Sequence, residues 1–181
     1  ISMTRIDDAV LRILRVKLRA GLRFPNKPSD RPIAGKSELV GSAAHRAIAR
    51  QAVRESAVLL KNNASSLPLK PNAKLLVTGS GADNISMQAG GWSLTWQGDG
   101  VGNDDFPGAT SVFQAIKGAL ADGNGHAELS ENVDNATAYD AVVVVFGEQP
   151  YAEGYGDRTH LSYSSISPKD LETLKKVSGK V

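Results

Sequence analysis

The chain has 181 residues, of which 41% are hydrophobic and 22% charged, so it can bury the core of about one domain. It contains no cysteine, which excludes a disulfide framework, a thiolate metal site and a cysteine nucleophile. The formal net charge of +2 hides an asymmetry: Lys and Arg outnumber Asp and Glu by 13 to 5 up to Lys61, and Asp and Glu outnumber Lys and Arg by 14 to 8 beyond it.

Residues 4–22 carry apolar side chains at helical spacing and predict a helix with one buried face. Thr4 is a plausible N-cap and Gly21 a plausible stop. Residues 23–37 contain three prolines and almost no periodicity, which is typical of an inter-domain linker. Residues 1–22 are therefore expected to form the last helix of an upstream domain that the chain does not contain.

The excess of basic charge in residues 1–61 does not indicate a nucleic-acid partner. They are spread along an amphipathic helix, and no aromatic residues interleave with them as a reader of single strands requires. No apolar stretch approaches the roughly 18 residues of a membrane span. We therefore expect neither nucleic-acid binding nor a membrane-spanning segment.

Residues 38–181 alternate helical and strand patterns. The pattern predicts helices at 37–61, 111–121 and 168–177 and strands at 74–79, 127–130 and 139–147. Such alternation indicates an α/β domain with a mostly parallel sheet covered by helices on both faces. The run Ala141–Phe146 is the most apolar of the chain and predicts a buried strand.

The sequence offers little support for a cofactor or metal site. Gly79-Ser-Gly81 follows a strand, but Asn84 stands where a dinucleotide fingerprint needs its third glycine, and a tight turn with close backbone contact is the favoured interpretation. The three histidines, at 45, 126 and 160, have no metal-ligand spacing. No cofactor and no metal are expected.

Both tryptophans of the chain, Trp92 and Trp96, lie in a glycine-rich segment at 89–102. An indole face suits the C–H face of a sugar ring, and Gln97 and Asp99 would offer hydrogen bonds to its hydroxyls. A structural tryptophan pair explains the same residues equally well.

Two carboxylates, Glu148 and Glu153, follow the predicted strand 139–147 in an acidic, glycine-rich and aromatic loop. The carboxyl ends of parallel strands commonly carry the chemistry of α/β folds, so both are candidates for proton transfer. A polar surface loop with helix-capping acids is the alternative.

Six motifs in this order resemble glycoside hydrolase family 3, the exo-acting β-glucosidases and β-glucan glucohydrolases. They stand at residues 5–22, 49–62, 67–69, 82–84, 90–98 and 147–158, and the pair Gly90-Gly-Trp and Gln149-Pro-Tyr-Ala-Glu is most similar to the plant and bacterial exo-glucanases. The resemblance implies that residues 1–22 are the last helix of a (β/α)8 barrel. It also implies that residues 38–181 are the first part of an (α/β)6-type sandwich domain.

By motif position, the resemblance implies that Glu153 is the acid/base of a retaining glycosidase and that Glu148 is the weaker alternative. Trp92 and Trp96 match aromatic residues that bind the substrate, and Asp157 and Arg158 are expected to pair and support the loop. A general acid must start protonated, so its pKa is expected to be raised by apolar rings and by the charge of the nucleophile.

The family's nucleophile, an aspartate in a Ser-Asp-Trp triplet of the barrel, has no counterpart here, so the chain is expected to be an inactive fragment when isolated. The expected partners are a β-glucan or β-glucoside substrate and the missing barrel domain. Family members are often exported, which implies a secreted or periplasmic protein, and three Asn-x-Ser/Thr triplets begin at Asn63, Asn84 and Asn135. A non-catalytic carbohydrate-binding or scaffold module is the alternative function.

Overall fold

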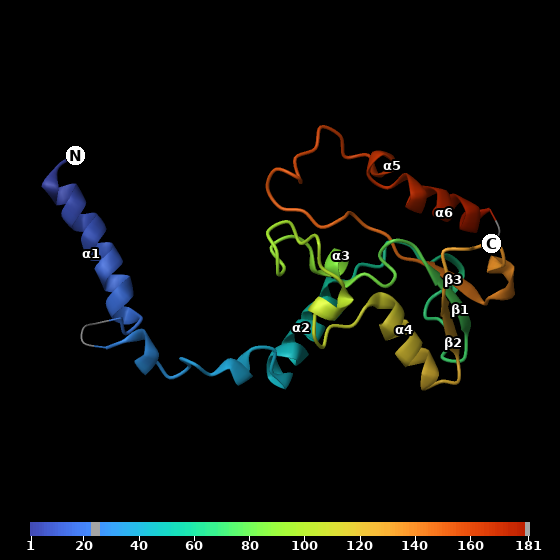
Figure 1. The fold of residues 1–181 in the computed structure, drawn as a ribbon, viewed down its shortest axis with the longest axis horizontal. Helices are drawn as coiled ribbons and strands as arrows, with labels where there is room; N and C mark the ends of the chain where they lie inside the picture. The colour runs from blue at the N-terminus through green and yellow to red at the C-terminus, as the bar shows by residue number, and fades with distance from the viewer. Residues whose placement is uncertain (23–25, 180–181) are drawn as a thin grey trace. The chain divides into compact units, whose positions relative to one another are not determined.

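The computed structural model describes residues 1–22 and 26–179, and Figure 1 labels its helices and strands. The chain divides into two compact units, Ile1–Lys61 and Asn62–Val181. The division falls after the second long helix, whereas the sequence places a domain boundary between residues 37 and 38. Residues 23–25 of the predicted linker lie outside the described part, and short 3-10 turns occupy Pro28–Asp30 and Ser37–Leu39.

Helix α1 spans Met3–Arg19, close to the predicted helix, but Ser2 rather than Thr4 is its N-cap. The Ser2 hydroxyl accepts the backbone N–H of Arg5, and Gly21 ends the helix with a φ of 73°. The predicted apolar stripe is present, yet no residue of α1 is buried in the described structure. The predicted helix is therefore confirmed, and no described residue of the first unit covers its apolar face.

Helix α2 spans Ala43–Ser56 and is shorter at both ends than the predicted helix at 37–61. Gly41 has a φ of 66°, which interrupts helical geometry, and the helix starts afresh where the Ser42 hydroxyl accepts the N–H of His45. At the other end, Ala57 leaves the helical region with a ψ of 130°. Apolar periodicity continued past both ends, which is why the sequence overestimated the helix.

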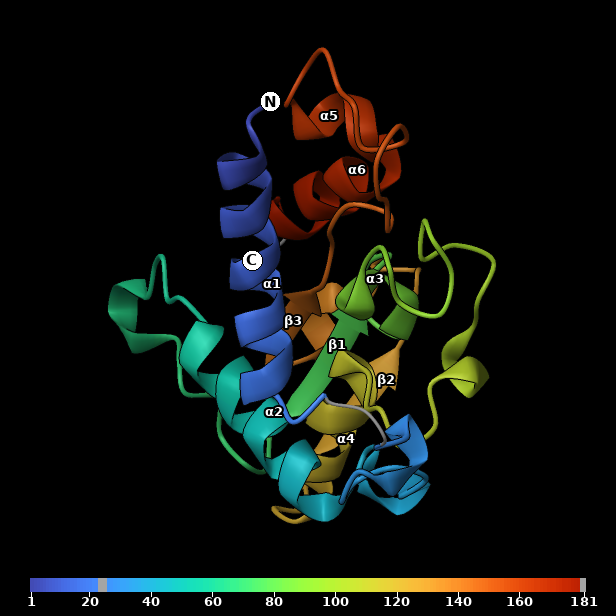
Figure 2. The same cartoon turned by 90° about the vertical axis from the view of Figure 1, so that its left-hand side faces the viewer.

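The second unit is built on a three-stranded sheet formed by β1 (Lys74–Thr78), β2 (His126–Leu129) and β3 (Ala141–Val144). Both pairings are parallel, and β1 lies between the other two strands, as Figure 2 shows. The predicted parallel α/β sheet is confirmed.

Side chains of β1 alternate between two cores. Leu75 and Val77 pack with Phe113 and Leu120 of α4 (Val112–Ala121), whereas Leu76 packs with Val177 of α6 (Pro168–Ser178). Successive side chains of a strand point to opposite faces, so α4 and α6 cover opposite faces of the sheet. This confirms the prediction of helices on both faces.

The strand at Ala141–Phe146, which the sequence predicts to be buried, is less buried than β1. Leu75, Leu76 and Val77 of β1 are at most 1% exposed, whereas every residue of β3 is only half-buried. In the described sheet β3 pairs with β1 alone, so it is an edge strand despite its highly apolar sequence.

The glycine turn after β1 serves close backbone packing, as predicted. A Cβ atom on Gly79 would collide with the carbonyl oxygen of Val145, and the Gly81 N–H donates to that same oxygen at 3.0 Å. The turn thus joins the ends of β1 and β3 and brings the segments that follow them together. A short helix, α3 (Ile85–Ala89), comes next and leads into the tryptophan segment.

Candidate active site

Two segments meet at the candidate site: the tryptophan loop, residues 90–100 after α3, and the acidic loop, residues 147–158 after β3. Their backbones approach so closely that a Cβ atom on Gly91 would collide with the carbonyl oxygen of Tyr151. On Gly98 a Cβ atom would collide with the backbone of Gly90 and lie 2.9 Å from the Pro150 side chain. The glycines of the tryptophan loop therefore permit the contact between the two loops.

Glu153 and Trp96, which are 57 residues apart in sequence, are joined directly. The indole Nε1–H of Trp96 donates to Glu153 Oε2 at 2.8 Å. The carboxylate is exposed, so a substrate has access to it. The structure thus brings together a proton-transfer candidate and a sugar-platform candidate that the sequence predicted separately.

The surroundings of Glu153 in this chain lower its pKa below the usual value. The chief cause is the hydrogen bond from Trp96, with smaller contributions from the backbone of Glu153 itself and from Trp92, while slight burial acts in the opposite direction. The sequence-based expectation was a pKa raised by apolar rings and by the charge of the nucleophile; the residues of this segment by themselves act in the opposite direction. The neighbouring rings contribute N–H donors rather than an apolar wall.

The two tryptophan rings form a tilted pair, with centroids 6.1 Å apart and planes at 40°. Trp92 is 69% exposed and Trp96 57%, so neither indole is packed into a core. Trp92 has a φ of 61°, and its N–H donates to the Trp96 carbonyl at 2.9 Å. A non-glycine residue in this left-handed region is costly and commonly occurs at functional sites. Exposure and backbone strain favour a binding role over a purely structural tryptophan pair.

Gln97 does not serve the role that the sequence suggested. Its Nε2 donates to the Glu153 carbonyl at 3.0 Å, and its Oε1 accepts the Ala152 N–H at 2.7 Å. The side-chain amide is therefore engaged with the acidic loop at both ends, instead of being held out for the hydroxyls of a sugar.

Glu148 has a different partner from Glu153. Its carboxylate raises the pKa of the Tyr151 hydroxyl, first through a side-chain hydrogen bond and then through its negative charge. The predicted pairing of Asp157 with Arg158 is not among the ion pairs of the described residues. Instead, the Asp157 N–H closes a turn onto the Gly154 carbonyl, and the charge of Arg158 acts to lower the pKa of Tyr151.

Asp170 is a buried acid that the sequence analysis missed. Its carboxylate is 3% exposed and accepts hydrogen bonds from Ser80 in the glycine turn, from Tyr163 of α5 (Tyr163–Ile166) and from Ser167. Burial acts to raise its pKa, but these hydrogen bonds outweigh burial and hold the pKa below the usual value. The Ser167-x-x-Asp170 spacing at the start of α6 resembles a capping box and was the available signal.

This network also closes the base of the acidic loop. The Tyr163 hydroxyl donates to the Gly147 carbonyl at 3.1 Å, and its ring lies 5.3 Å from that of Phe146. Gly147 is the first residue of the acidic loop, shortly after β3 ends at Val144, and Tyr163 is where the chain becomes helical again. Glu153 thus lies in a segment, residues 147–163, whose first and last residues are hydrogen-bonded to each other.

We expect Gly91→Ala to separate the two loops, because the new methyl group would collide with the Tyr151 carbonyl. Overpacking of this kind costs about 1–3 kcal/mol of stability. Gly102→Ala is the matched control, since a Cβ atom there meets nothing within 4 Å and the φ is −108°. Thermal unfolding of the two variants measures the difference, and an equal Tm would contradict the close approach.

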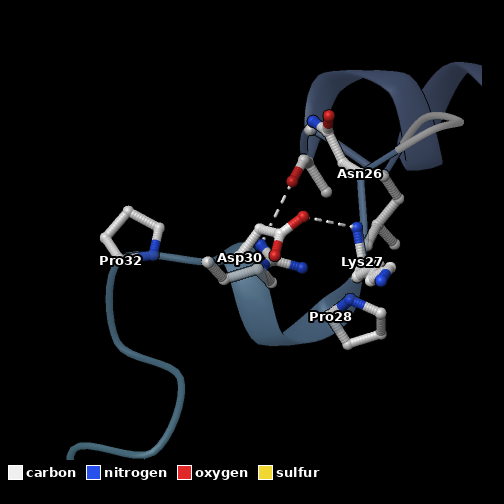
Figure 3. A pocket seen from close by; sticks show the side chains of 9 residues that line it. Asn26, Lys27, Pro28, Asp30 and Pro32 are labelled. Carbon is white, nitrogen blue, oxygen red and sulfur yellow. Dashed lines mark hydrogen bonds between the residues drawn. The ribbon is translucent and has the colours of Figure 1, made fainter.

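Other features of the described residues do not form a second candidate site. No three His, Asp or Glu side chains of residues 1–22 and 26–179 gather as metal ligands. A hollow of about 440 Å³ lies in the first unit and is lined by residues of 20–22 and 26–32, as Figure 3 shows. Its charged groups contact neighbouring backbone: Asp30 accepts the Lys27 N–H, and Arg31 donates to the Ala20 carbonyl. Within these same residues, no helix has the length and hydrophobicity needed to cross a bilayer.

The sequence profile of the glycosyl hydrolase family 3 C-terminal domain matches residues 57–181. This family consists of enzymes that cleave carbohydrates. The matched residues include the parallel sheet and the two loops that carry Glu153 and the tryptophans. The chain belongs to glycosyl hydrolase family 3, as its motifs predicted.

Two relatives have names that agree with this family assignment. The chain is 37% identical over 192 residues to the lysosomal beta glucosidase of Dictyostelium discoideum, covering 96% of this chain and 23% of that protein. It is 30% identical over 220 residues to the periplasmic beta-glucosidase of Salmonella typhimurium, covering 99% of this chain and 27% of that protein.

A crystal structure is also similar, that of an exo-1,3/1,4-beta-glucanase from a Pseudoalteromonas species. The two chains are 44% identical with a TM-score of 0.89, covering 99% of this chain and 23% of the glucanase. The chain therefore spans about a quarter of the length of the relatives that it matches.

Proposed function

We propose that this chain is part of a retaining exo-β-glucanase or β-glucosidase and supplies the acid/base glutamate and the aromatic sugar platforms. The observation that carries the proposal is the hydrogen bond between Trp96 and Glu153, because it places a carboxylate beside an exposed indole face. Family membership and the names of the relatives support a β-linked glucoside or glucan as the substrate.

The proposed mechanism needs a second carboxylate. In a retaining glycosidase the two carboxyl groups stand about 5 Å apart; one attacks the anomeric carbon while the other protonates the leaving oxygen and later deprotonates water. Glu153 would be the second of these groups. The first would be an aspartate of a barrel domain elsewhere in the protein, which is supported by the greater length of the relatives, of which this chain covers 23% in two cases.

The lowered pKa of Glu153 within this segment has to be offset if Glu153 is to act as the general acid. A general acid must be protonated when substrate binds, whereas hydrogen bonding within this chain favours the ionised form. The negative charge of the barrel aspartate would raise the pKa, and the donated N–H of Trp96 would limit that rise.

For the rest of the chain, we propose that residues 1–22 are the last helix of a (β/α)8 barrel, residues 23–37 a linker and residues 38–181 part of an (α/β)6-type sandwich. The exposed apolar stripe of α1 supports the first assignment, because such a stripe normally packs against other elements of its domain. The confirmed parallel sheet with helices on both faces supports the last assignment.

We also propose that the protein is exported, since one relative is named periplasmic and another lysosomal. The three glycosylation triplets are not equally suited to modification. The Asn84 side chain accepts the Met87 N–H, and Ser86 is 8% exposed and donates to the Gly98 carbonyl. Asn63 and Asn135 are exposed and are the more suitable acceptors.

The test compares the full-length enzyme with the isolated 181-residue chain on an aryl β-glucoside. We expect the full-length enzyme to release β-glucose first, observed by NMR of the anomeric proton, and the isolated chain to release none. Hydrolysis by the isolated chain would place both carboxylates within it, and a full-length protein that binds glycan without cleaving it would support the non-catalytic module.

A further inference from the structure

We propose that Gln97 is a positioning residue for Glu153, holding the backbone of the acidic loop while Trp96 holds the carboxylate. This inference rests on the proposed function of Glu153 as the acid/base. Its basis is the two-point contact in which the Gln97 amide donates to the Glu153 carbonyl at 3.0 Å and accepts the Ala152 N–H at 2.7 Å.

The contact fixes the orientation of the acidic loop as well as its distance from the tryptophan loop. The side-chain amide accepts from the N–H of one residue and donates to the C=O of the next, so two hydrogen bonds of different direction constrain the segment. Rotation of the Ala152–Glu153 segment would break at least one of the two hydrogen bonds. Gln97 and Trp96 are adjacent in sequence, so a single turn of the tryptophan loop holds Glu153 at its carbonyl and at its carboxylate.

The turn that carries Gln97 is itself anchored. The next residue, Gly98, is buried, and its carbonyl accepts the Ser86 hydroxyl of α3 at 2.6 Å. Helix α3 begins after Asn84, whose side chain accepts the Met87 N–H at 2.9 Å. The Gln97 contact thus connects the exposed Glu153 to a buried part of the second unit. Positioning matters here because a displacement of about 1 Å can cost about 100-fold in rate.

A second glutamine provides a matched control. Gln88 makes the same kind of two-point contact: its Nε2 donates to the Thr110 carbonyl and its Oε1 accepts the Val112 N–H, both at 3.2 Å. It holds the segment that precedes α4 and contacts neither the acidic loop nor Trp96 in any hydrogen bond of the described residues. Gln88→Ala therefore removes an equivalent structural contact without touching Glu153.

The experiment measures kcat/KM of the full-length enzyme on two aryl β-glucosides. Dinitrophenolate leaves without protonation, whereas phenolate needs the general acid, so the ratio of the two values reports how well Glu153 is placed. We expect Gln97→Ala to lower the phenyl glucoside value by about 10- to 100-fold. The dinitrophenyl value should change by less than about threefold, because it does not depend on the acid. Gln88→Ala should leave the ratio at the wild-type value.

Two results would overturn the inference: an unchanged ratio in Gln97→Ala, whether both kcat/KM values stay at the wild-type level or fall equally, or the same change of ratio in Gln88→Ala. If the alanine variant does not fold, the same ratio of kcat/KM values is measured for Gln97→Glu. This variant keeps the acceptor for the Ala152 N–H and loses the donor to the Glu153 carbonyl. The kcat/KM of Glu153→Ala is measured on the same two substrates. If it changes the ratio and the Gln97 variants do not, the inference fails and the proposed function stands; if it leaves the ratio unchanged, the proposed function itself fails.

Discussion

Glu153→Ala in the full-length enzyme is expected to lower turnover of a substrate with a poor leaving group by about 100- to 10,000-fold. The reason is that no other carboxylate contacts Trp96 in the described structure, so no group replaces Glu153 as the proton donor. Steady-state kinetics on phenyl β-glucoside measure this loss. Azide should restore part of the rate on an activated glucoside, because a small anion can enter the vacated space and attack the glycosyl intermediate without base catalysis.

Glu148→Gln is the control for this prediction. Glu148 interacts with Tyr151 rather than with the tryptophans, so its removal should change turnover far less and should give no azide rescue. A large loss with rescue in Glu148→Gln, together with normal turnover in Glu153→Ala, would assign the acid/base role to Glu148. Normal turnover in both variants would favour the non-catalytic module.

Trp96→Phe is expected to move the alkaline limb of the kcat/KM profile to higher pH. Phenylalanine keeps an aromatic face but lacks the N–H that donates to Glu153, and this hydrogen bond is the chief cause that lowers the pKa of the carboxyl group. Without it the pKa rises, so the protonated form required of a general acid persists to higher pH. The acidic limb, which reports ionisation of the nucleophile, should not move. Kinetics across the pH range on a substrate with a poor leaving group measure both limbs.

Trp96→Ala separates stacking from hydrogen bonding. It should produce the same displacement of the alkaline limb and, in addition, raise KM by about fivefold, which corresponds to about 1 kcal/mol of lost aromatic contact. Trp92→Phe retains the Trp96 donor and should displace the alkaline limb less, since Trp92 contributes less to the pKa of Glu153. An alkaline limb that stays in place in both Trp96 variants would show that the hydrogen bond does not control the acid.

The predictions for Glu153 and Trp96 both depend on the position of Trp96, which is proposed to contact the substrate and is hydrogen-bonded to the acid. Its indole is more than half exposed for stacking, while its N–H is committed to Glu153. A sugar ring that packs on the indole is therefore brought to the side chain that orients the proton donor. Substrate position and acid orientation would depend on the same residue.

Local patterns predicted much of the second unit. The strands β1, β2 and β3 and the helices α4 and α6 all lie within a few residues of their predicted ranges. The alternation of strands and helices also predicted the parallel sheet correctly. These features depend on neighbouring residues, namely apolar periodicity, caps at Ser111 and Ser167, and proline at the first turn of α6.

The sequence by itself therefore determined the class of fold, the family and the identity of Glu153, Trp92 and Trp96 as candidates, because each has a local or motif signature. Only the tertiary structure decided that β3 is a half-buried edge, that Asp170 ties the base of the acidic loop and that Gln97 holds the Glu153 backbone. It also showed that Trp96, Trp92 and the backbone of this segment lower the pKa of Glu153. The physical reason is the same in each case: sheet position, hydrogen-bond partners and pKa values depend on contacts between residues far apart in sequence, which no local pattern encodes.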